Sequence, residues 1–168
     1  KKGYFERFQL FCQNLFIEKA TSIGWDAAPG EKHLDSLLRS VLLTRIAAYG
    51  HSATLHTGLA RYSRFLEDPS SLQPDLKDIV FGIAANQGSQ RTFDQMLTLY
   101  GNSDQHEEKV RMLRAMSMFS DKDLLKKTLG ISLNQDLVRN QDVVSLVTSI
   151  ANNNAGLTMA WDFVKSNW

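Results

Sequence analysis

The chain has 168 residues, of which 43% are apolar and 22% are charged, proportions that are ordinary for a globular protein. Its 19 basic and 18 acidic residues give a formal net charge of +1, which excludes the strong field that nucleic-acid or anionic-lipid binding requires. The only cysteine, Cys12, excludes an internal disulfide framework. No unbroken apolar run approaches the ~18 residues of a membrane span. We therefore expect one domain with a hydrophobic core, no nucleic-acid partner and no membrane span.

The first half of the chain predicts four helices. Apolar residues at helical spacing place the first over residues 4–22 and the second over residues 32–49, with Gly50 as the stop of the second. The third is expected over residues 52–67, and the fourth over residues 74–88, where a proline occupies the first turn. The apolar stripe of the second helix, expected to be buried along one side, consists of Leu34, Leu37, Leu38, Val41, Leu42 and Ile46.

The second half predicts five more helices, so that we expect about nine in total. The eighth helix should end at the turn of residues 152–154, and the ninth should follow Gly156. No segment alternates with a period of two over a useful length, so no strands are expected. The expected starts or N-caps of the fifth to eighth helices are Ser89, Ser103 or Asp104, Asp121, and Asn140 or Asp142.

The spacing of these helices predicts a repeat architecture. Helix starts near residues 51, 89, 121 and 155 are separated by 38, 32 and 34 residues, and short loops join the helices into pairs. Pairs at this loose period are typical of an α-solenoid of HEAT- or armadillo-like antiparallel helix pairs. We expect an all-α single domain over residues 1–168, wound into a right-handed superhelical arch. Residues 1–24 would form a leading helix and residues 31–168 the stacked pairs.

Two separated segments carry recognisable motifs. The first is Ile23-Gly24-Trp25-Asp26, followed by Gly30-Glu31-x-His33-Leu34-Asp35 and Leu37-Leu38-Arg39. The second is Val138-Arg139-Asn140-Gln141-Asp142-Val143-Val144, followed by Ala160-Trp161-Asp162-Phe163-Val164-Lys165-x-Asn167-Trp168. In this order they resemble the C-terminal helical domain of the M1-family zinc aminopeptidases, nearest the puromycin-sensitive type. The resemblance covers almost the whole chain.

The resemblance implies an enzyme that removes N-terminal residues from peptides through a zinc-activated water. Such an enzyme needs a His-Glu-x-x-His helix, in which two imidazoles one turn apart bind the zinc. The only His-Glu pair here is His106-Glu107, and Val110 stands where the second histidine is required. We therefore expect no catalytic residue and no metal ligand in this chain, and we assign the zinc to a catalytic domain of the full-length protein.

In the family that the chain resembles, this domain arches over the catalytic domain and closes a cavity. The implied partners are the catalytic domain of the same polypeptide and peptide substrates. Guanidinium and amide groups suit the carboxylate and backbone of a peptide, although Arg39 and Arg139 could instead cap carbonyls or pair with acids between repeats. We expect Trp25 and His33 to hold the joint between leading helix and repeats. The candidates for contact with peptide are Arg39, Arg45, Arg139, Asn152 and Asn154.

Two other functions remain open from the sequence. A helical-repeat scaffold that binds a protein partner on its concave face, with no relation to an enzyme, would have the same fold, and self-association is a third possibility. Apolar helical patterns run close to both ends of the chain, which predicts an excerpt of a longer protein. The single cysteine and the resemblance to a cytosolic branch favour a cytoplasmic location.

Overall fold

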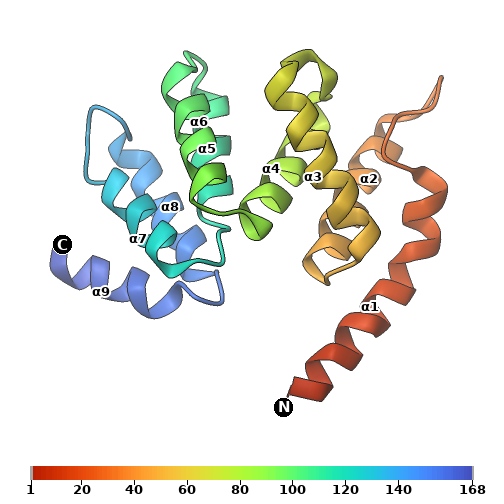
Figure 1. Ribbon diagram of the computed structural model, residues 1–168, viewed down its shortest axis with the longest axis horizontal. Helices are drawn as coiled ribbons and strands as arrows, with labels where there is room; N and C mark the ends of the chain where they lie inside the picture. The colour runs from red at the N-terminus through yellow and green to blue at the C-terminus, as the bar shows by residue number, and fades with distance from the viewer. Residues whose placement is uncertain (1, 168) are drawn as a thin grey trace. The chain divides into compact units, whose positions relative to one another are not determined.

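The computed structural model describes residues 2–167, and this part of the chain is all-α, as the sequence predicts (Figure 1). It contains nine α-helices, one short 3-10 helix and no strand within the described range. Lys1 and Trp168, the last residue of the second matched motif, lie outside that range. The helices are α1 (Lys2–Ile23), α2 (His33–Ala48), α3 (Ser52–Glu67), η1 (Pro69–Ser71), α4 (Pro74–Gln87), α5 (Gln90–Asn102), α6 (His106–Met116), α7 (Lys122–Ile131), α8 (Asn140–Ala151) and α9 (Leu157–Asn167).

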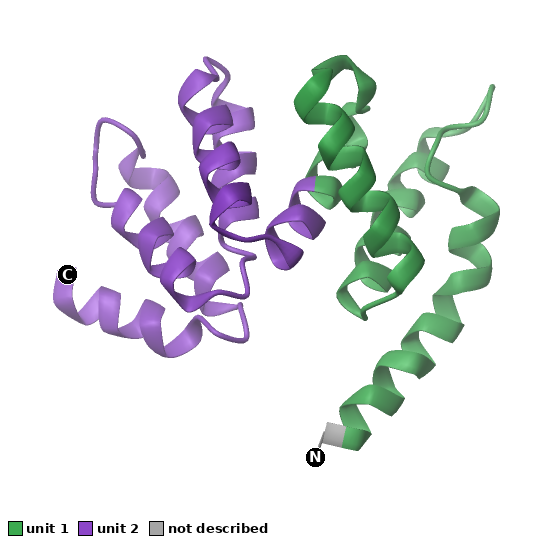
Figure 2. Ribbon diagram, in the orientation of Figure 1, with its two compact units in different colours: residues 1–80 green, residues 81–168 purple. Residues whose placement is uncertain are grey.

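The chain divides into two compact units, Lys1–Val80 and Phe81–Trp168, with the boundary inside α4 (Figure 2). Within unit 1, α1 packs on α2 and α2 packs on α3. Within unit 2, α5 pairs with α6, α8 pairs with α9, and α6 and α7 both contact α8. Within each unit, several helices that are neighbours in the chain thus pack on one another, while the repeat architecture and the right-handed arch stay predictions. No helix within residues 2–167 combines the length and apolar character needed to cross a membrane.

Most of the predicted helix ends are confirmed. Asp121 caps α7, because its Oδ1 accepts hydrogen bonds from the backbone N–H groups of Asp123 (2.7 Å) and Leu124 (3.3 Å). Ser89 is the N-cap of α5. The predicted cap of α6 was wrong, since α6 begins after Gln105. The Ser103 hydroxyl oxygen accepts a hydrogen bond from the Gln105 N–H at 3.2 Å, which forms a turn immediately before α6.

The corner between α2 and α3 shows how a predicted stop works. Gly50 has φ +80°, a left-handed conformation that glycine adopts without a steric penalty. Its N–H donates to the Ala47 carbonyl at 2.9 Å, and the His51 N–H donates to the Ile46 carbonyl at 3.0 Å. These two bonds form a Schellman motif, which satisfies the last carbonyls of α2. The chain then starts α3 at once, with His51 as its N-cap.

The buried face of α2 differs from the predicted stripe. Leu42 and Ile46 are buried, but Leu34, Leu37 and Val41 are 74%, 50% and 56% exposed. The helix is rotated so that Arg39 and Leu43 take part in its buried face, which meets α1 and α3. On α1 the buried side chains are small, and most large apolar ones point outward. The exposed set on α1 is Tyr4, Phe5, Phe8, Leu10, Phe11 and Leu15.

The core of unit 2 is denser in large apolar side chains. Phe93 and Phe119 pack with ring centroids 5.7 Å apart. Met96 and Met116 are fully buried, which agrees with methionine as a filler of irregular core space, whereas Met118 is partly exposed. The largest fully buried side chains of this unit are Phe81, Phe119, Met96, Met116, Leu125, Ile150 and Val138.

Candidate functional site

Arg39 lies in unit 1, and its side chain is only 3% exposed. Its Nη1 donates to Glu31 Oε1 at 2.7 Å, its Nη2 donates to Glu31 Oε2 and to the Ile23 carbonyl, and its Nε donates to the Gly24 carbonyl at 3.1 Å. The hydrogen bond from Arg39 holds the pKa of the Glu31 carboxyl below its ordinary value, and the same bond raises the pKa of Arg39. Every guanidinium nitrogen is therefore engaged in tying the end of α1 to α2.

Trp25 lies in the turn between α1 and α2 and is half-buried. The Arg61 guanidinium, which comes from α3, is 5.1 Å from the centroid of a Trp25 ring. Arg61 Nη2 also donates to Asp26 Oδ2 at 2.6 Å, and this hydrogen bond lowers the pKa of Asp26. The turn is thus attached to α3 through two contacts of one arginine. His33, the first residue of α2, is exposed.

Arg45 also belongs to unit 1 and is exposed in the last turn of α2. Its position near the helix C-terminus is electrostatically favourable, because a cation there faces the negative end of the helix dipole. Unlike Arg39, it presents its side chain to solvent.

The three asparagines of the turn between α8 and α9 differ in burial and in hydrogen bonding. Asn152 and Asn154 are exposed. Asn153 is half-buried and donates from Nδ2 to the carbonyls of Ser117 and Phe119, each at 2.9 Å, while its Oδ1 accepts the Ala155 N–H at 2.9 Å. It therefore fastens the turn to the segment that follows α6. This structural role of Asn153 was not predicted, because a run of three identical residues contains no signal for which one points inward.

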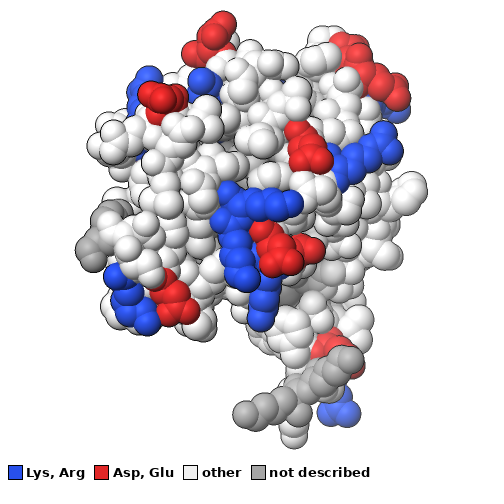
Figure 3. Space-filling view, turned by 60° about the vertical axis from the view of Figure 1, so that its left-hand side comes forward, with Lys and Arg blue, Asp and Glu red and all other residues white. Residues whose placement is uncertain are grey.

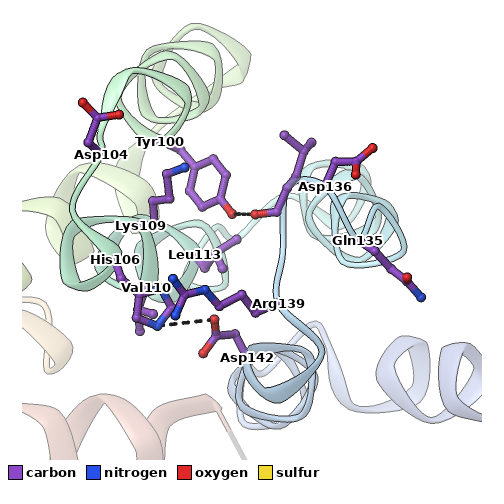
Figure 4. A pocket seen from close by; sticks show the side chains of 11 residues that line it. Tyr100, Asp104, His106, Lys109, Val110, Leu113, Gln135, Asp136, Arg139 and Asp142 are labelled. Carbon is purple, nitrogen blue, oxygen red and sulfur yellow. Dashed lines mark hydrogen bonds and ion pairs between the residues drawn. The ribbon is translucent and has the colours of Figure 1, made fainter.

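Arg139 lies in unit 2 as the exposed N-cap residue of α8, at the edge of a pocket of about 140 Å³. Three regions meet there: the end of α5, the start of α6, and the loop between α7 and α8 (Figure 4). The lining residues are Tyr100, Asp104, His106, Lys109, Val110, Leu113, Gln135, Asp136, Leu137, Arg139 and Asp142. Of these, only Arg139 was a predicted site residue.

One wall of the pocket is built on Tyr100. Its hydroxyl donates to the Leu137 carbonyl, which attaches the α7–α8 loop to α5. The Lys109 ammonium lies 5.6 Å from the centroid of the Tyr100 ring, in a cation–π contact. Burial raises the pKa of Tyr100, and the negative charge of Asp142 adds to the effect. The Tyr100 hydroxyl thus stays protonated as a donor.

The opposite wall carries a histidine and a carboxylate. His106 Nε2, at the start of α6, is 3.6 Å from Asp142 Oδ2, in the first turn of α8. Figure 4 shows Arg139 extending across the pocket toward α6, while Asp104 and Gln135 point away from its centre. The pair of His106 and Asp142 was not predicted. The only sign of this pair in the sequence is that Asp142 belongs to the Arg-x-Gln-Asp motif at residues 139–142.

The charged side chains do not gather into an area of one sign on the face seen in Figure 3. Basic and acidic groups lie beside one another on a largely uncharged surface. This distribution agrees with the nearly balanced composition. Among the residues that the structure describes, no three or more His, Cys, Asp or Glu side chains are grouped so as to hold a metal ion.

Comparison with known proteins gives a consistent result along the whole chain. The family model described as "ERAP1-like C-terminal domain" matches residues 1–168. Aminopeptidase M1-A of Oryza sativa subsp. japonica is 36% identical over 159 residues, which cover 91% of this chain and 18% of the relative. Aminopeptidase M1 of Arabidopsis thaliana is 30% identical over 163 residues, 94% of this chain and 18% of the relative. Glutamyl aminopeptidase of Bos taurus is 28% identical over 150 residues, which cover 89% of this chain and 16% of the relative.

Proposed function

Because the chain belongs to the ERAP1-like C-terminal domain family of the M1 aminopeptidases, we propose that it is the non-catalytic part of a zinc aminopeptidase that releases N-terminal amino acids from peptides. The observation that carries this proposal is the family match over residues 1–168, together with relatives that are aminopeptidases. The chain spans less than a fifth of the length of these relatives, so the activity is proposed for the whole protein. A scaffold with no relation to an enzyme is not favoured by these matches.

The proposed division of labour follows from the residues present. In the full-length protein, a zinc ion bound by a catalytic domain would activate the water that attacks the scissile carbonyl. The part described here would close over the active site and form the cavity that accommodates the peptide. Because the catalytic chemistry acts on the N-terminal residue, groups in this part would contact the remainder of the substrate. The exposed donors that support such contacts are Arg45, Arg139, Asn152 and Asn154.

Arg39 is not part of the proposed cavity, since its guanidinium is buried against Glu31 and two backbone carbonyls. For Trp25 we propose the structural role that the sequence predicts, supported by its contact with Arg61 of α3. The same role for His33, and the nearest relationship to the puromycin-sensitive type, stay predictions. We also propose a cytoplasmic location, which is supported by a single cysteine, Cys12, buried on α1.

The proposal is tested by comparing the full-length protein with the 168-residue chain. The full-length protein should release the chromophore from an aminoacyl-p-nitroanilide and contain bound zinc. The isolated chain should do neither, and zinc content by mass spectrometry and turnover by absorbance measure both. Stoichiometric zinc with turnover in the isolated chain would contradict the non-catalytic assignment. A full-length protein without aminopeptidase activity would contradict the proposed function itself.

A second experiment tests the closing role. Removal of this part from the full-length protein should change the hydrolysis of long peptides more than that of a single-residue chromogenic amide, because only the long substrate reaches beyond the catalytic domain. The ratio of kcat/KM for the two substrates is the readout. An unchanged ratio in a variant that still binds zinc would show that this part does not form the peptide cavity.

A further inference from the structure

Met118, which follows the end of α6, differs from the other methionines in its exposure. The chain has five methionines, all within the described residues. Met96, Met112 and Met116 are buried, and Met159 on α9 is half-buried. Met118 is 39% exposed. Solvent and small dissolved molecules therefore reach this methionine more readily than the other four.

The Met118 side chain lies against α4. A Cβ added to Gly82 would be 2.9 Å from Met118 Sδ and 3.9 Å from Met118 Cε, so the thioether rests on the backbone of α4 where that helix carries no side chain. Gly82 is itself half-buried, which places the contact at the surface of unit 2 and not in its core. The sulfur thus takes part in helix packing and lies close to solvent.

The backbone around Met118 is held from two directions within unit 2. The Asn86 side chain, on α4, donates from Nδ2 to the Met118 carbonyl at 3.4 Å, and the Ser120 hydroxyl donates to the Asn86 carbonyl at 3.0 Å. Asn153 donates from Nδ2 to the carbonyls of the residues before and after Met118, each at 2.9 Å. Residues 117–120, here called the α6–α7 segment, therefore join α4 to the turn between α8 and α9.

The thioether contact is the part of the junction with α4 that water cannot replace. Asn86 and Ser120 are both exposed, so water can take over their hydrogen bonds at little cost. An apolar contact has no such substitute. Phe81 and Ala84 of α4 stay buried in the core, so loss of the Met118 contact would loosen the exposed side of α4 and not unfold it.

A peroxide can change this contact chemically. The Sδ lone pair attacks one oxygen of the peroxide, an S–O bond forms as the O–O bond breaks, and the proton of the transferred oxygen passes to the departing one. With hydrogen peroxide, the thioether is oxidised to the sulfoxide and the peroxide is reduced to water. The sulfoxide is polar and carries an additional oxygen on the sulfur, so it fits poorly in an apolar contact.

We propose that Met118 is a reversible oxidation site, at which a peroxide converts the thioether to the sulfoxide and weakens the attachment of the α6–α7 segment to α4. The hydrogen bonds of Asn153 to the same segment involve only backbone carbonyls, so they remain after oxidation. Methionine sulfoxide reductases reverse this modification, which makes the attachment sensitive to the redox state of the surroundings. The inference does not depend on the proposed aminopeptidase function.

Treatment of the folded 168-residue chain with hydrogen peroxide tests the proposal. Tandem mass spectrometry of proteolytic peptides follows each methionine and separates Met118 from its neighbour Met116. Met118 should gain an oxygen atom several-fold faster than Met159, and the three buried methionines should react last. The same treatment in urea should remove these differences, because they arise from the fold. The melting temperature of the oxidised chain should fall by about 3 °C.

Three variants separate this contact from general damage. Met118→Leu keeps an apolar side chain without an oxidisable sulfur, so it should melt close to the parent chain and resist the effect of peroxide. Met118→Gln places a polar group at the same position and should lower the melting temperature without peroxide. Met159→Leu removes the half-buried sulfur on α9 and should show the same peroxide effect as the parent chain. Methionine sulfoxide reductases should restore the melting temperature of the oxidised parent chain.

Three results would overturn the proposal. The first is a folded chain in which Met118 is oxidised no faster than Met159. The second is an oxidised chain that melts at the temperature of the untreated one. The third is a Met118→Leu variant whose melting temperature falls in peroxide as much as that of the parent chain, because the effect would then arise from another residue.

Discussion

Two arginines that look alike in the sequence have opposite environments in the two units. Arg39 of unit 1 is buried, and each of its guanidinium nitrogens donates to Glu31 or to a carbonyl at the end of α1. Arg139 of unit 2 is exposed at the start of α8 and extends across a pocket (Figure 4). The difference shows that an arginine becomes a clamp where the backbone and an acid surround it, and a candidate ligand-binding group where they do not.

The asparagine turn gives the same contrast within three residues. The Asn153 amide donates hydrogen bonds to the carbonyls of Ser117 and Phe119, while the side chains of Asn152 and Asn154 are exposed to solvent. Gly156 lies two residues after Asn154, and a Cβ there would lie 2.0 Å from the Ile150 carbonyl oxygen, so no other residue fits. The turn is therefore held from both sides, and only Asn152 and Asn154 present their side chains to solvent.

The largest predicted effect is a difference in the free energy of unfolding between variants of Arg39 and Arg139. Arg39→Met should lower the free energy of unfolding by about 3 kcal/mol, because Glu31 and two carbonyls lose their partner in a nearly buried site. Arg139→Met should change it by no more than about 0.5 kcal/mol, as is usual for exposed positions. Urea unfolding followed by circular dichroism measures both. Equal losses in the two variants would remove the distinction between clamp and pocket residue.

The next largest effect concerns the asparagine turn. Asn153→Ala should cost about 2 kcal/mol, because two carbonyl acceptors and the Ala155 N–H lose their partner. The matched controls Asn152→Ala and Asn154→Ala should each stay within about 0.5 kcal/mol of the parent chain. Thermal melting of the three variants is the measurement. If the two controls are destabilised as much as Asn153→Ala, the turn is held by something other than the Asn153 amide.

A smaller effect is expected at the wall of the pocket. Tyr100→Phe removes the hydroxyl that donates to the Leu137 carbonyl and should cost about 1 kcal/mol. The aromatic face under Lys109 remains, so the loss should come from the hydrogen bond alone. Urea unfolding followed by circular dichroism measures the loss. A Tyr100→Phe chain as stable as the parent chain would show that this hydroxyl does not hold the loop.

The smallest predicted effect is a dependence of the stability of unit 1 on pH. Arg39 lowers the pKa of Glu31 from its ordinary 4.5, and Arg61 lowers that of Asp26 from its ordinary 3.8. A carboxyl whose pKa is lower in the folded state stabilises the fold above its unfolded pKa and loses that contribution as the pH falls through the folded value. The melting temperature should therefore decline as the pH drops below 4.5.

Glu31→Gln tests the origin of this decline. The variant should melt at a lower temperature near neutral pH and should lose less stability on acidification, because one of the two titrating carboxyls is gone. In an Arg39→Met background, Glu31→Gln should no longer change how steeply the melting temperature falls with pH. If Glu31→Gln in the parent chain leaves this dependence unchanged, a group other than Glu31 causes the acid destabilisation.

The sequence by itself determined the helices and their family. Helical periodicity, the Gly50 stop and the Asp121 cap depend on residues within one or two turns of each other, so they can be read from a short window. The two motifs that resemble the M1 aminopeptidases are also local strings, and the family match over residues 1–168 confirms the assignment they support.

Only the tertiary structure decided which side chains each helix buries and which polar groups remain available. The rotation of α2 left Leu34 and Leu37 exposed and enclosed Arg39, because its neighbours α1 and α3 set the buried face. The pocket beside Arg139 depends on Tyr100 and His106, residues more than 30 positions away, which meet it only after the helices of unit 2 pack. Burial and convergence of charge arise from contacts between distant segments, and no local pattern in the chain encodes them.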